Sequence, residues 1–376
     1  MKIYKENNVV DEALERIRFI FDEFPNVVAS VSGGKDSTVI FDLTLRVARE
    51  RGRLPLKVMF IDQEAEYQAT INHMRNIMNN PDVQPYWFQM PIKIFNATSM
   101  TEHWLQCWKE GDEWIREKEP NSIKVNSYGT DRFHDLFPAI FLKEFSDTPS
   151  AGTAGVRAEE SPTRYTTLIS TAKYKWVTYC KGLNRKKNHF TFYPIYDWSY
   201  TDIWKYIFEN KLDYNRIYLK FYQYGIPFTK MRVSNLHHET SVHSLFNLQE
   251  VEPETYEKLN VRLKGIDMAG KFGKDDFFVH DVPFMFKDKK EYRDFLLEKL
   301  TDKKWKESFR DKFKKLDERY AEVNDIDKIY DAEINSILTN DWEFIKLHNM
   351  ERRPEFHNYR IFKRTGKSDP NNRGLM

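Results

Sequence analysis

The sequence predicts an α/β fold, in which a doubly wound, mostly parallel sheet is followed by a helical C-terminal region. Three observations favour this fold. Short β-branched runs alternate with segments of helical spacing, polar or small residues bound the runs, and the chain becomes helical and highly charged after about residue 229. The 376 residues suffice for two or three domains. We expect an α/β domain over 1–230 and a charged, mainly helical region over 231–376.

The first strands and helices follow one another in a regular order. Strand candidates are NVVASV at 26–31, KVMFI at 57–61 and a weaker QPYWFQM at 84–90. Apolar residues at helical spacing mark the stretches between them, 37–51 and 65–80. This strand–helix–strand order predicts parallel strands with helices on both faces of the sheet.

The rest of the chain divides into two zones. Between 104 and 227 it is less periodic, with strand candidates at 153–157 and 190–195, each followed by a helix-like segment. We expect these to continue the sheet, and the Trp-rich stretch 104–126 to form an insertion or lid. Farther on, amphipathic patterns predict three charged helices that cover a sheet edge or form an oligomer or partner interface, at 287–300, 301–321 and 325–347.

Charge and hydropathy exclude several classes of protein. Lys+Arg 59 nearly balance Asp+Glu 57, so the chain is no polycationic nucleic-acid coat. No apolar run approaches the roughly 18 residues that a transmembrane helix needs, and the N-terminus has no signal-peptide pattern. We therefore expect a cytoplasmic protein without a membrane partner, in the host cytoplasm if a phage encodes it.

Metal-ligating residues are sparse. The two cysteines, Cys107 and Cys180, exclude a disulfide framework, a four-cysteine zinc site and an iron–sulfur cluster held by the cysteines of one chain. Three histidines lie close in sequence, His237, His238 and His243, but the last two are five apart, which does not place both imidazoles on one helix face. We expect surface or capping roles for them and no structural zinc.

The strongest local signal joins the first strand to the first helix, and reads Ser32-Gly33-Gly34-Lys35-Asp36-Ser37-Thr38. Two glycines allow a tight turn that brings backbone N–H groups against an anion. The helix start adds unpaired N–H donors and a positive dipole end, the hydroxyl groups add donors, and Lys35 adds a charge. The carboxyl end of a strand is also where open α/β sheets bind ligands. The alternative is a glycine turn that merely links a strand to a helix.

This segment resembles the PP-loop of the adenine nucleotide alpha-hydrolase superfamily. That superfamily, of the HUP/PP-loop fold, includes ATP pyrophosphatases, the adenylyltransferase subunit of ATP sulfurylase and phosphoadenosine phosphosulfate (PAPS) reductases. Three more blocks sharpen the resemblance. FIDQE at 60–64 lies where this superfamily places an acidic turn beneath the adenosine. Two blocks resemble the PAPS reductase family, GVRAEESPTR at 155–164 and YPIYDWSYTDIW at 193–204. The resemblance covers about the first 230 residues and is closest to the uncharacterised group found in prophages and mobile elements.

The resemblance implies a set of site residues. Those with a catalytic role would be Lys35, Asp36, Arg157 and Arg164, with Asp36 also holding Mg²⁺. Those that bind nucleotide would be Ser32, Gly33, Gly34, Ser37, Thr38, Asp62, Glu64 and Gly155. The two arginines can clamp phosphate or sulfate with bidentate forks, although Arg157 could instead pair with Glu159 or Glu160.

Three assignments stay open at this stage. Asp62 and Glu64 could hold Mg²⁺ or a ribose hydroxyl, or equally cap a helix. The segment 197–204 is more typical of packing and helix capping than of catalysis. A basic run at 181–187 is either a solvated loop or a second contact to phosphate or nucleic acid.

The family pattern breaks at the cysteine. PAPS reductases use a cysteine near the C-terminus, whereas this chain has none after Cys180, whose surroundings do not match. Reduction needs a thiolate, and the cysteine pairs of PP-loop sulfurtransferases are missing too. We therefore expect binding of ATP or a related adenine (sulfo)nucleotide with Mg²⁺, cleavage of the α–β phosphate bond, pyrophosphate release and adenylyl transfer.

Two alternatives remain. The first is a nucleotide sensor or transcriptional co-regulator without turnover, for which the resemblance implies a ParB-like protein partner. The second is a sulfonucleotide reductase or sulfurtransferase. Either protein could form a homo-oligomer.

Overall fold

The computed structural model describes residues 6–95, 104–145, 148–169, 171–228, 231, 233, 235–236, 242–263, 282–301, 303–323, 325–338, 341–342 and 344–365. These residues form two compact units, of which the first ends in the described chain at Leu263 and the second begins at residue 282. No helix within the described ranges is long and apolar enough to cross a lipid bilayer.

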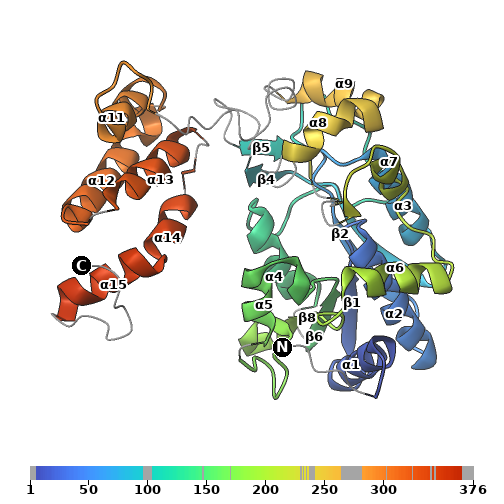
Figure 1. The fold of residues 1–376 in the computed structure, drawn as a ribbon. Helices are drawn as coiled ribbons and strands as arrows, with labels where there is room; N and C mark the ends of the chain where they lie inside the picture. The colour runs from blue at the N-terminus through green and yellow to red at the C-terminus, as the bar shows by residue number, and fades with distance from the viewer. Residues whose placement is uncertain are drawn as a thin grey trace. The chain divides into compact units, whose positions relative to one another are not determined.

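A six-stranded sheet within the described residues forms the centre of the first unit (Figure 1). Its order is β3-β2-β1-β6-β8-β7, and all neighbours are parallel except the antiparallel pair β7 and β8. This confirms the predicted doubly wound, mostly parallel sheet. The strands are β1 (Asn26–Ser30), β2 (Leu56–Ile61), β3 (Val83–Phe88), β6 (Ser150–Ala154), β7 (Cys180–Asn184) and β8 (His189–Phe192).

Helices cover both faces of this sheet, as adjacent residues of β6 demonstrate. The Thr153 hydroxyl lies 3.1 Å from that of Thr44 in α2, whereas a Cβ atom at Gly152 would lie 3.3 Å from the Phe141 ring of α4. Since successive residues of a strand point to opposite faces, α2 and α4 lie on opposite sides. The helices of this part are α1 (Val9–Glu23), α2 (Lys35–Glu50), α3 (Gln68–Met78), α4 (Phe133–Glu144), α5 (Pro162–Ile169), α6 (Tyr200–Glu209) and α7 (Ile217–Gln223).

The strand order places a topological switch point between β1 and β6. From β1 the chain proceeds to β2 and β3 on one side, and it later adds β6 on the other. Ser30 of β1 pairs with Ala154 of β6, so both strands end at the same level. The loops that follow them therefore start side by side, at the position where doubly wound sheets bind ligands.

The family-like block at 193–204 has a structural role. Asp197 accepts two hydrogen bonds of 2.7 Å from Arg16, and the fully buried Trp198 donates through its Nε1 to the carbonyl oxygen of Val9. Ser199 caps α6 and forms a capping box with Asp202. The packing and capping function predicted for this block is confirmed.

The Trp-rich region begins with a small sheet of its own. Strands β4 (Ile92–Phe95) and β5 (Trp104–Cys107) pair antiparallel. They were absent from the sequence prediction, because four-residue strands give too short an alternation to recognise. Two 3₁₀ turns also occur, at Ala158–Glu160 and Arg185–Lys187.

Helices α8 (Val242–Val251) and α9 (Pro253–Arg262) complete the first unit at the end opposite α1 (Figure 1). Glu252, between them, accepts hydrogen bonds from the backbone N–H groups of Gln68 and Ala69, at 2.7 and 3.0 Å. A carboxylate placed there caps the start of α3 and complements its dipole. Residues after 230 thus hold an element of the first 100 residues in place.

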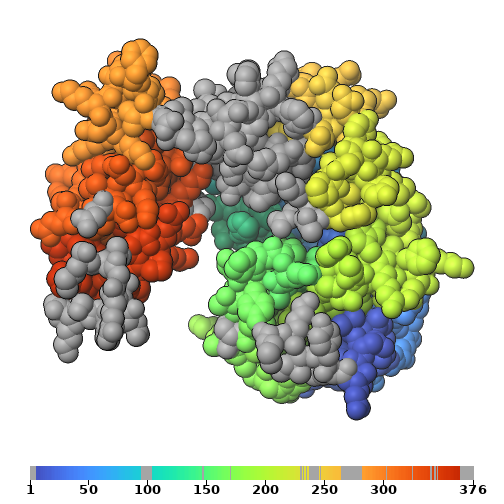
Figure 2. Space-filling model, viewed as in Figure 1, coloured from blue at the N-terminus to red at the C-terminus, as the bar shows by residue number. Residues whose placement is uncertain are grey.

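The second unit is helical, and Figure 2 shows its helices packed as one continuous body. Its core contains Phe309, which is fully buried and contacts the rings of Phe313, Trp342 and Phe344. The helices are α11 (Lys289–Lys299), α12 (Lys303–Tyr320), α13 (Ile326–Leu338), α14 (Ile345–Glu351) and α15 (Pro354–Thr365).

One predicted helix is wrong in its length. The stretch 325–347 forms two helices instead of one, because Phe344 adopts a left-handed backbone with φ 56° that an α-helix cannot continue. The Asp341 carboxylate accepts the backbone N–H of Lys346 at 2.7 Å and so supports the new helix start.

Because each unit has its own buried core, we expect Phe309→Ala to destabilise the second unit alone. Loss of a buried aromatic ring should lower its free energy of unfolding by about 3–5 kcal/mol. Hydrogen exchange followed by mass spectrometry should show faster exchange in α12–α14 and unchanged protection in β1 and α2. An equal loss of protection in β1 would show that the two units unfold together.

Candidate functional site

The diglycine loop has a conformation that depends on glycine at its first position. Gly33 has φ 72°, in the left-handed region, and a Cβ atom there would lie 2.5 Å from the Cγ2 of Thr70. Gly34 is the N-cap residue of α2 in extended conformation and provides no side-chain cap. The first-turn N–H groups of α2 therefore need partners from outside the loop.

All three predicted hydroxyl donors are hydrogen-bonded within the protein. Ser37 Oγ accepts the backbone N–H of Ser32 at 3.2 Å and donates to the carbonyl of Gly34 at 2.8 Å. Thr38 Oγ1 donates to the same carbonyl at 3.1 Å and lies 2.8 Å from Nε2 of His73. Ser32 is an exposed residue, and its hydroxyl donates to Ser37 Oγ at 3.3 Å.

The structure brings Lys35, Asp36 and Arg157 together at the loop. The Asp36 carboxylate accepts a hydrogen bond of 2.8 Å from Lys35 Nζ and pairs through its other oxygen with Arg157 Nε. The Arg157 side chain is buried and also contacts Glu159, at 3.1 Å. Asp36 thus holds two cationic groups next to the loop. The pair between Arg157 and Glu159, an alternative that the sequence left open, is also present.

Arg164 occupies a different environment. It lies on α5 with its side chain half-exposed and pairs with Glu160 one turn earlier. Glu160 in turn accepts the backbone N–H of Arg157 at 2.9 Å. Arg164 is therefore linked to the Asp36 cluster through Glu160.

Gly155 allows the end of β6 to touch the backbone of α2. A Cβ atom at Gly155 would lie 2.6 Å from the carbonyl carbon and oxygen of Asp36, and 2.8 Å from the backbone nitrogen of Ser37. Real side chains do not approach a backbone this closely, so only glycine fits. This contact brings the segment that carries Arg157 against the first turn of α2.

Asp62 and Glu64 are fully buried and bound by other side chains. Asp62 accepts hydrogen bonds from the side chains of Trp87 at 3.0 Å and Gln89 at 2.9 Å, and pairs with Arg116. Glu64 accepts the backbone N–H of Trp108 at 2.7 Å and pairs with Arg262 at 2.7 Å. Both carboxylates belong to buried ion pairs in this structure, and the Mg²⁺, ribose-hydroxyl and capping roles considered for them stay predictions.

Glu66 belongs to the same acidic turn but is held differently. Burial, together with the nearby Asp62 carboxylate, raises the pKa of Glu66 to about 8. Burial also raises the pKa of the Cys107 thiol, whose sulfur lies 3.2 Å from the carbonyl oxygen of Gln63. At neutral pH both groups therefore carry their protons.

The described residues contain no group of three or more His, Cys, Asp or Glu side chains that could hold a metal ion. Mg²⁺ in nucleotide sites usually needs only one or two carboxylates, with phosphates and water as its other ligands. Asp36 is the carboxylate at the loop that fits this requirement. His237 and His238 lie outside the described residues, as does the side chain of His243.

Several residues at the loop were missed by the sequence analysis. His73 of α3 contacts Thr38, and burial lowers its pKa. Asn215 and Tyr218 contact the backbone of Gly33 and Lys35. No local pattern marks these residues, since Asn215 and Tyr218 lie more than 180 residues from the loop in sequence.

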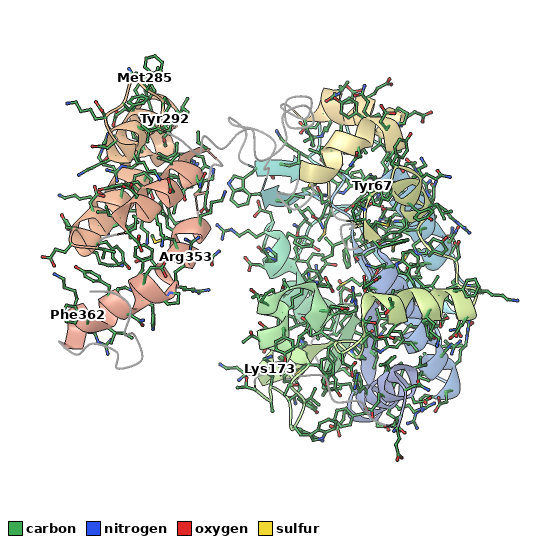
Figure 3. The ribbon with its side chains drawn as sticks, in the orientation of Figure 1. Tyr67, Lys173, Met285, Tyr292, Arg353 and Phe362 are labelled. Atoms are coloured by element: carbon green, nitrogen blue, oxygen red, sulfur yellow. The ribbon has the colours of Figure 1, made fainter. Side chains whose placement is uncertain are left out.

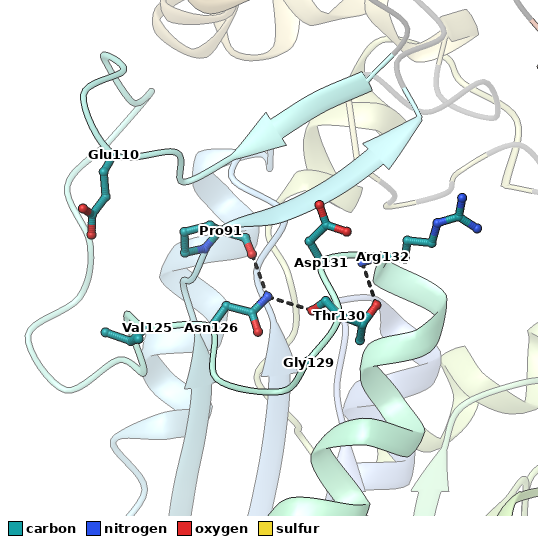
Figure 4. Close-up of a pocket in the computed structure, with 8 residues that line it drawn as sticks. All are labelled: Pro91, Glu110, Val125, Asn126, Gly129, Thr130, Asp131 and Arg132. Carbon is teal, nitrogen blue, oxygen red and sulfur yellow. Dashed lines mark hydrogen bonds between the residues drawn. The ribbon is translucent and has the colours of Figure 1, made fainter.

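A hollow of about 680 Å³ lies elsewhere, beside β4 (Figure 4). Asn126 donates from its Nδ2 to the carbonyl oxygens of Pro91 and Thr130, both at 2.9 Å, so these polar groups bond to one another. No residue of the diglycine loop lines this hollow. Its lining residues are Pro91, Glu110, Val125, Asn126, Gly129, Thr130, Asp131 and Arg132.

The fold and the loop define the class of protein: an open α/β protein whose diglycine loop opens a helix at the switch point of a parallel sheet. A family model described as the phosphoadenosine phosphosulfate reductase domain matches residues 26–224, more than half of the chain. The chain therefore belongs to the PAPS reductase domain family, which confirms the resemblance. A second model, a domain of unknown function (DUF3440), matches residues 225–360.

Individual proteins resemble this chain to different extents. Uncharacterized protein YbdN of Escherichia coli (strain K12) is 29% identical over 296 residues, which cover 74% of this chain and 72% of the relative. Sulfate adenylyltransferase subunit 2 of Shewanella woodyi is 23% identical over 226 residues, which cover 55% of this chain and 65% of the relative. The crystal structure of PAPS reductase from Candida auris, in a phosphate complex, aligns with a TM-score of 0.34 at 16% identity, over 63% of this chain and 98% of that one.

Substitution of Gly155 by alanine tests the close approach of β6 to α2. The added methyl group meets backbone atoms that cannot rotate away, so we expect a loss of roughly 1–3 kcal/mol in the free energy of unfolding. Gly34→Ala is the control, because its Cβ atom would lie 3.5 Å from the nearest atom, an ordinary contact. Urea unfolding of both variants measures the difference; equal stabilities would contradict the geometry.

The pKa of Glu66 predicts a pH dependence. Its folded-state pKa of about 8 exceeds the ordinary value of 4.5, so its contribution to stability is fully present below pH 4.5 and is lost as pH rises to about 8. The free energy of unfolding of Glu66→Gln, taken relative to that of the parent protein, should therefore rise by roughly 2–4 kcal/mol between pH 5 and pH 8. Urea unfolding at both pH values provides the measurement, and a difference that stays constant with pH would refute the prediction.

Proposed function

We propose that this protein binds ATP or a related adenine nucleotide at the loop 32–38, cleaves the α–β phosphate bond, and releases pyrophosphate with adenylyl transfer. The observation that carries the proposal is the cluster of Lys35, Asp36 and Arg157 beside a diglycine loop at the switch point of the sheet. Family membership supports the same nucleotide class, and one relative is a sulfate adenylyltransferase subunit.

Each residue of the loop has a chemical task in this proposal. Backbone N–H groups of the loop and the positive end of α2 receive the terminal phosphates. Lys35 and Arg157 compensate the negative charge that grows on the leaving pyrophosphate. Asp36 keeps both cations in position and would also hold Mg²⁺, which supplies charge neutralisation when it arrives with the nucleotide. This chemistry requires no nucleophile from the protein.

The cysteines support a non-reductive reaction. Cys107 and Cys180 are both buried, and burial raises the pKa of Cys180 to about 11. Burial also raises the pKa of Cys107 well above its ordinary value. A sulfonucleotide reductase needs a thiolate that can attack, whereas both thiols remain protonated at neutral pH. We therefore place reduction and sulfur transfer last among the candidate activities.

Binding without turnover is the second candidate. The Asp36 carboxylate is already shared between Lys35 and Arg157, an arrangement that can hold phosphate without activating it. In that case the protein would act as a nucleotide sensor or co-regulator, for example with a protein partner. Product analysis separates the two functions, since only the enzyme breaks the α–β bond of ATP. It then releases pyrophosphate while the adenylyl group passes to an acceptor, or to water to give AMP.

Arg157→Lys tests the proposed site. Lysine keeps the charge but loses the planar fork, so we expect about a tenfold weaker affinity for ATP with Mg²⁺, and less pyrophosphate formed. Isothermal titration calorimetry and a pyrophosphate assay provide the readouts. Arg16→Lys is the matched control, because Arg16 is also mostly buried and forms a fork with Asp197, and its hydrogen-bond partners lie outside the loop 32–38.

Three outcomes distinguish the candidate functions. Pyrophosphate release by the parent protein, reduced in Arg157→Lys and not in Arg16→Lys, supports the enzyme. Tight binding without product supports the sensor. Absence of binding in the parent protein, or equal affinities in both variants, would overturn the assignment of the site.

A further inference from the structure

The first N–H group of α2 is capped from a distant part of the chain. Tyr218 of α7 accepts the backbone N–H of Lys35 through its hydroxyl oxygen, at 3.1 Å. The N-cap residue Gly34 has no side chain to do this, and a Cβ atom at Gly34 would lie 3.5 Å from the same hydroxyl. Tyr218 thus supplies an acceptor for one of the N–H groups that a helix start leaves unpaired.

Asn215, three residues earlier, fixes the other side of the glycine turn. It is fully buried and donates from Nδ2 to the carbonyl oxygen of Gly33 at 2.9 Å and to Thr70 Oγ1 at 2.8 Å. Its own Oδ1 accepts the backbone N–H of Ile217 at 3.1 Å, which fixes the orientation of the carboxamide. This segment therefore bonds both the carbonyl of Gly33 and the N–H of Lys35. These two groups set the peptide orientations of the loop.

The ring of Tyr218 has little freedom to move. It is 4% exposed and packs edge-on against Trp204, with 5.3 Å between ring centroids. The Lys35 ammonium lies 5.7 Å from the ring centroid on the loop side. Tyr67, labelled in Figure 3, supports the same helix by an edge-on contact with Phe221. Trp204 closes the family-like block 193–204, so this block reaches the loop through Tyr218.

We propose that Asn215 and Tyr218 are positioning residues, which hold the diglycine loop in the conformation that receives phosphate. This inference rests on the proposed nucleotide-binding function. With the Lys35 N–H bonded from the protein side, a bound anion uses the other first-turn N–H groups and the Lys35 side chain. The two residues reduce the ordering that binding would otherwise require, which raises affinity without contact to the nucleotide.

Tyr218→Phe tests the inference, because it removes one oxygen and keeps the ring packing. We expect the dissociation constant for ATP with Mg²⁺ to rise about tenfold, since a buried N–H loses its partner. If turnover is present, KM should rise by a similar factor while kcat changes less than about twofold. Hydrogen exchange of the segment 32–38 without nucleotide should become faster.

Tyr206→Phe is a closely matched control. Tyr206 is 3% exposed and its hydroxyl donates to the Asp42 carboxylate of the same helix at 2.7 Å, about one turn after the loop. It should lower the melting temperature as Tyr218→Phe does, yet leave ATP affinity and exchange at 32–38 unchanged. Asn215→Asp, which replaces the donor to Gly33 by an acceptor, should reproduce the loss seen in Tyr218→Phe.

Each result decides between the two proposals. If the parent protein binds ATP and Tyr218→Phe binds it equally well, the positioning role is overturned and the proposed function stands. Equal losses of affinity in Tyr206→Phe and Tyr218→Phe would mean that both tyrosines contribute only to general stability. That result would also overturn the positioning role. If the parent protein binds no adenine nucleotide, the proposed function fails and the inference fails with it.

Discussion

The contact between two backbones at Gly155 is the constraint on which the candidate site depends. Because residue 155 lacks a side chain, the end of β6 reaches the first turn of α2 at a distance that no other residue permits. That approach brings Arg157 to the carboxylate of Asp36, and Asp36 in turn holds Lys35. A shift of β6 by the width of one methyl group would separate the cations that give the loop its positive charge.

The loop itself is supported from several elements that are remote from one another in sequence. Thr70 and His73 contact it from α3, Asn215 and Tyr218 from the segment around the start of α7. These contacts use the protein-facing hydroxyl, carbonyl and amide groups of the loop. Thr38 and Ser37 bond inward although their residue types also suit a phosphate, and the exposed Ser32 donates its hydroxyl to Ser37.

Local pattern sufficed to predict the parallel strands, α2 and the diglycine loop, because each depends on neighbours in sequence. The roles of Asp62 and Glu64 could not be derived in this way. Their partners, Arg116 and Arg262, lie 54 and 198 residues away, and burial in ion pairs was not among the alternatives that a strand end suggests. The role of Tyr218 could not be predicted for the same reason, since nothing in the neighbouring sequence indicates that its hydroxyl accepts an N–H group of another helix.

The cap that Glu252 places on α3 has a consequence for how this protein can be divided or recombined. The two family models meet between residues 224 and 225, yet Glu252 and Arg262 lie in the second and complete the turn that follows β2 in the first. A fragment cut at that border would leave the Gln68 and Ala69 amides uncapped and the Glu64 carboxylate buried without its guanidinium. Exchange of C-terminal modules between homologues would be tolerated only beyond Leu263. The border between the two family models and the border between the two compact units therefore lie at different positions in the chain.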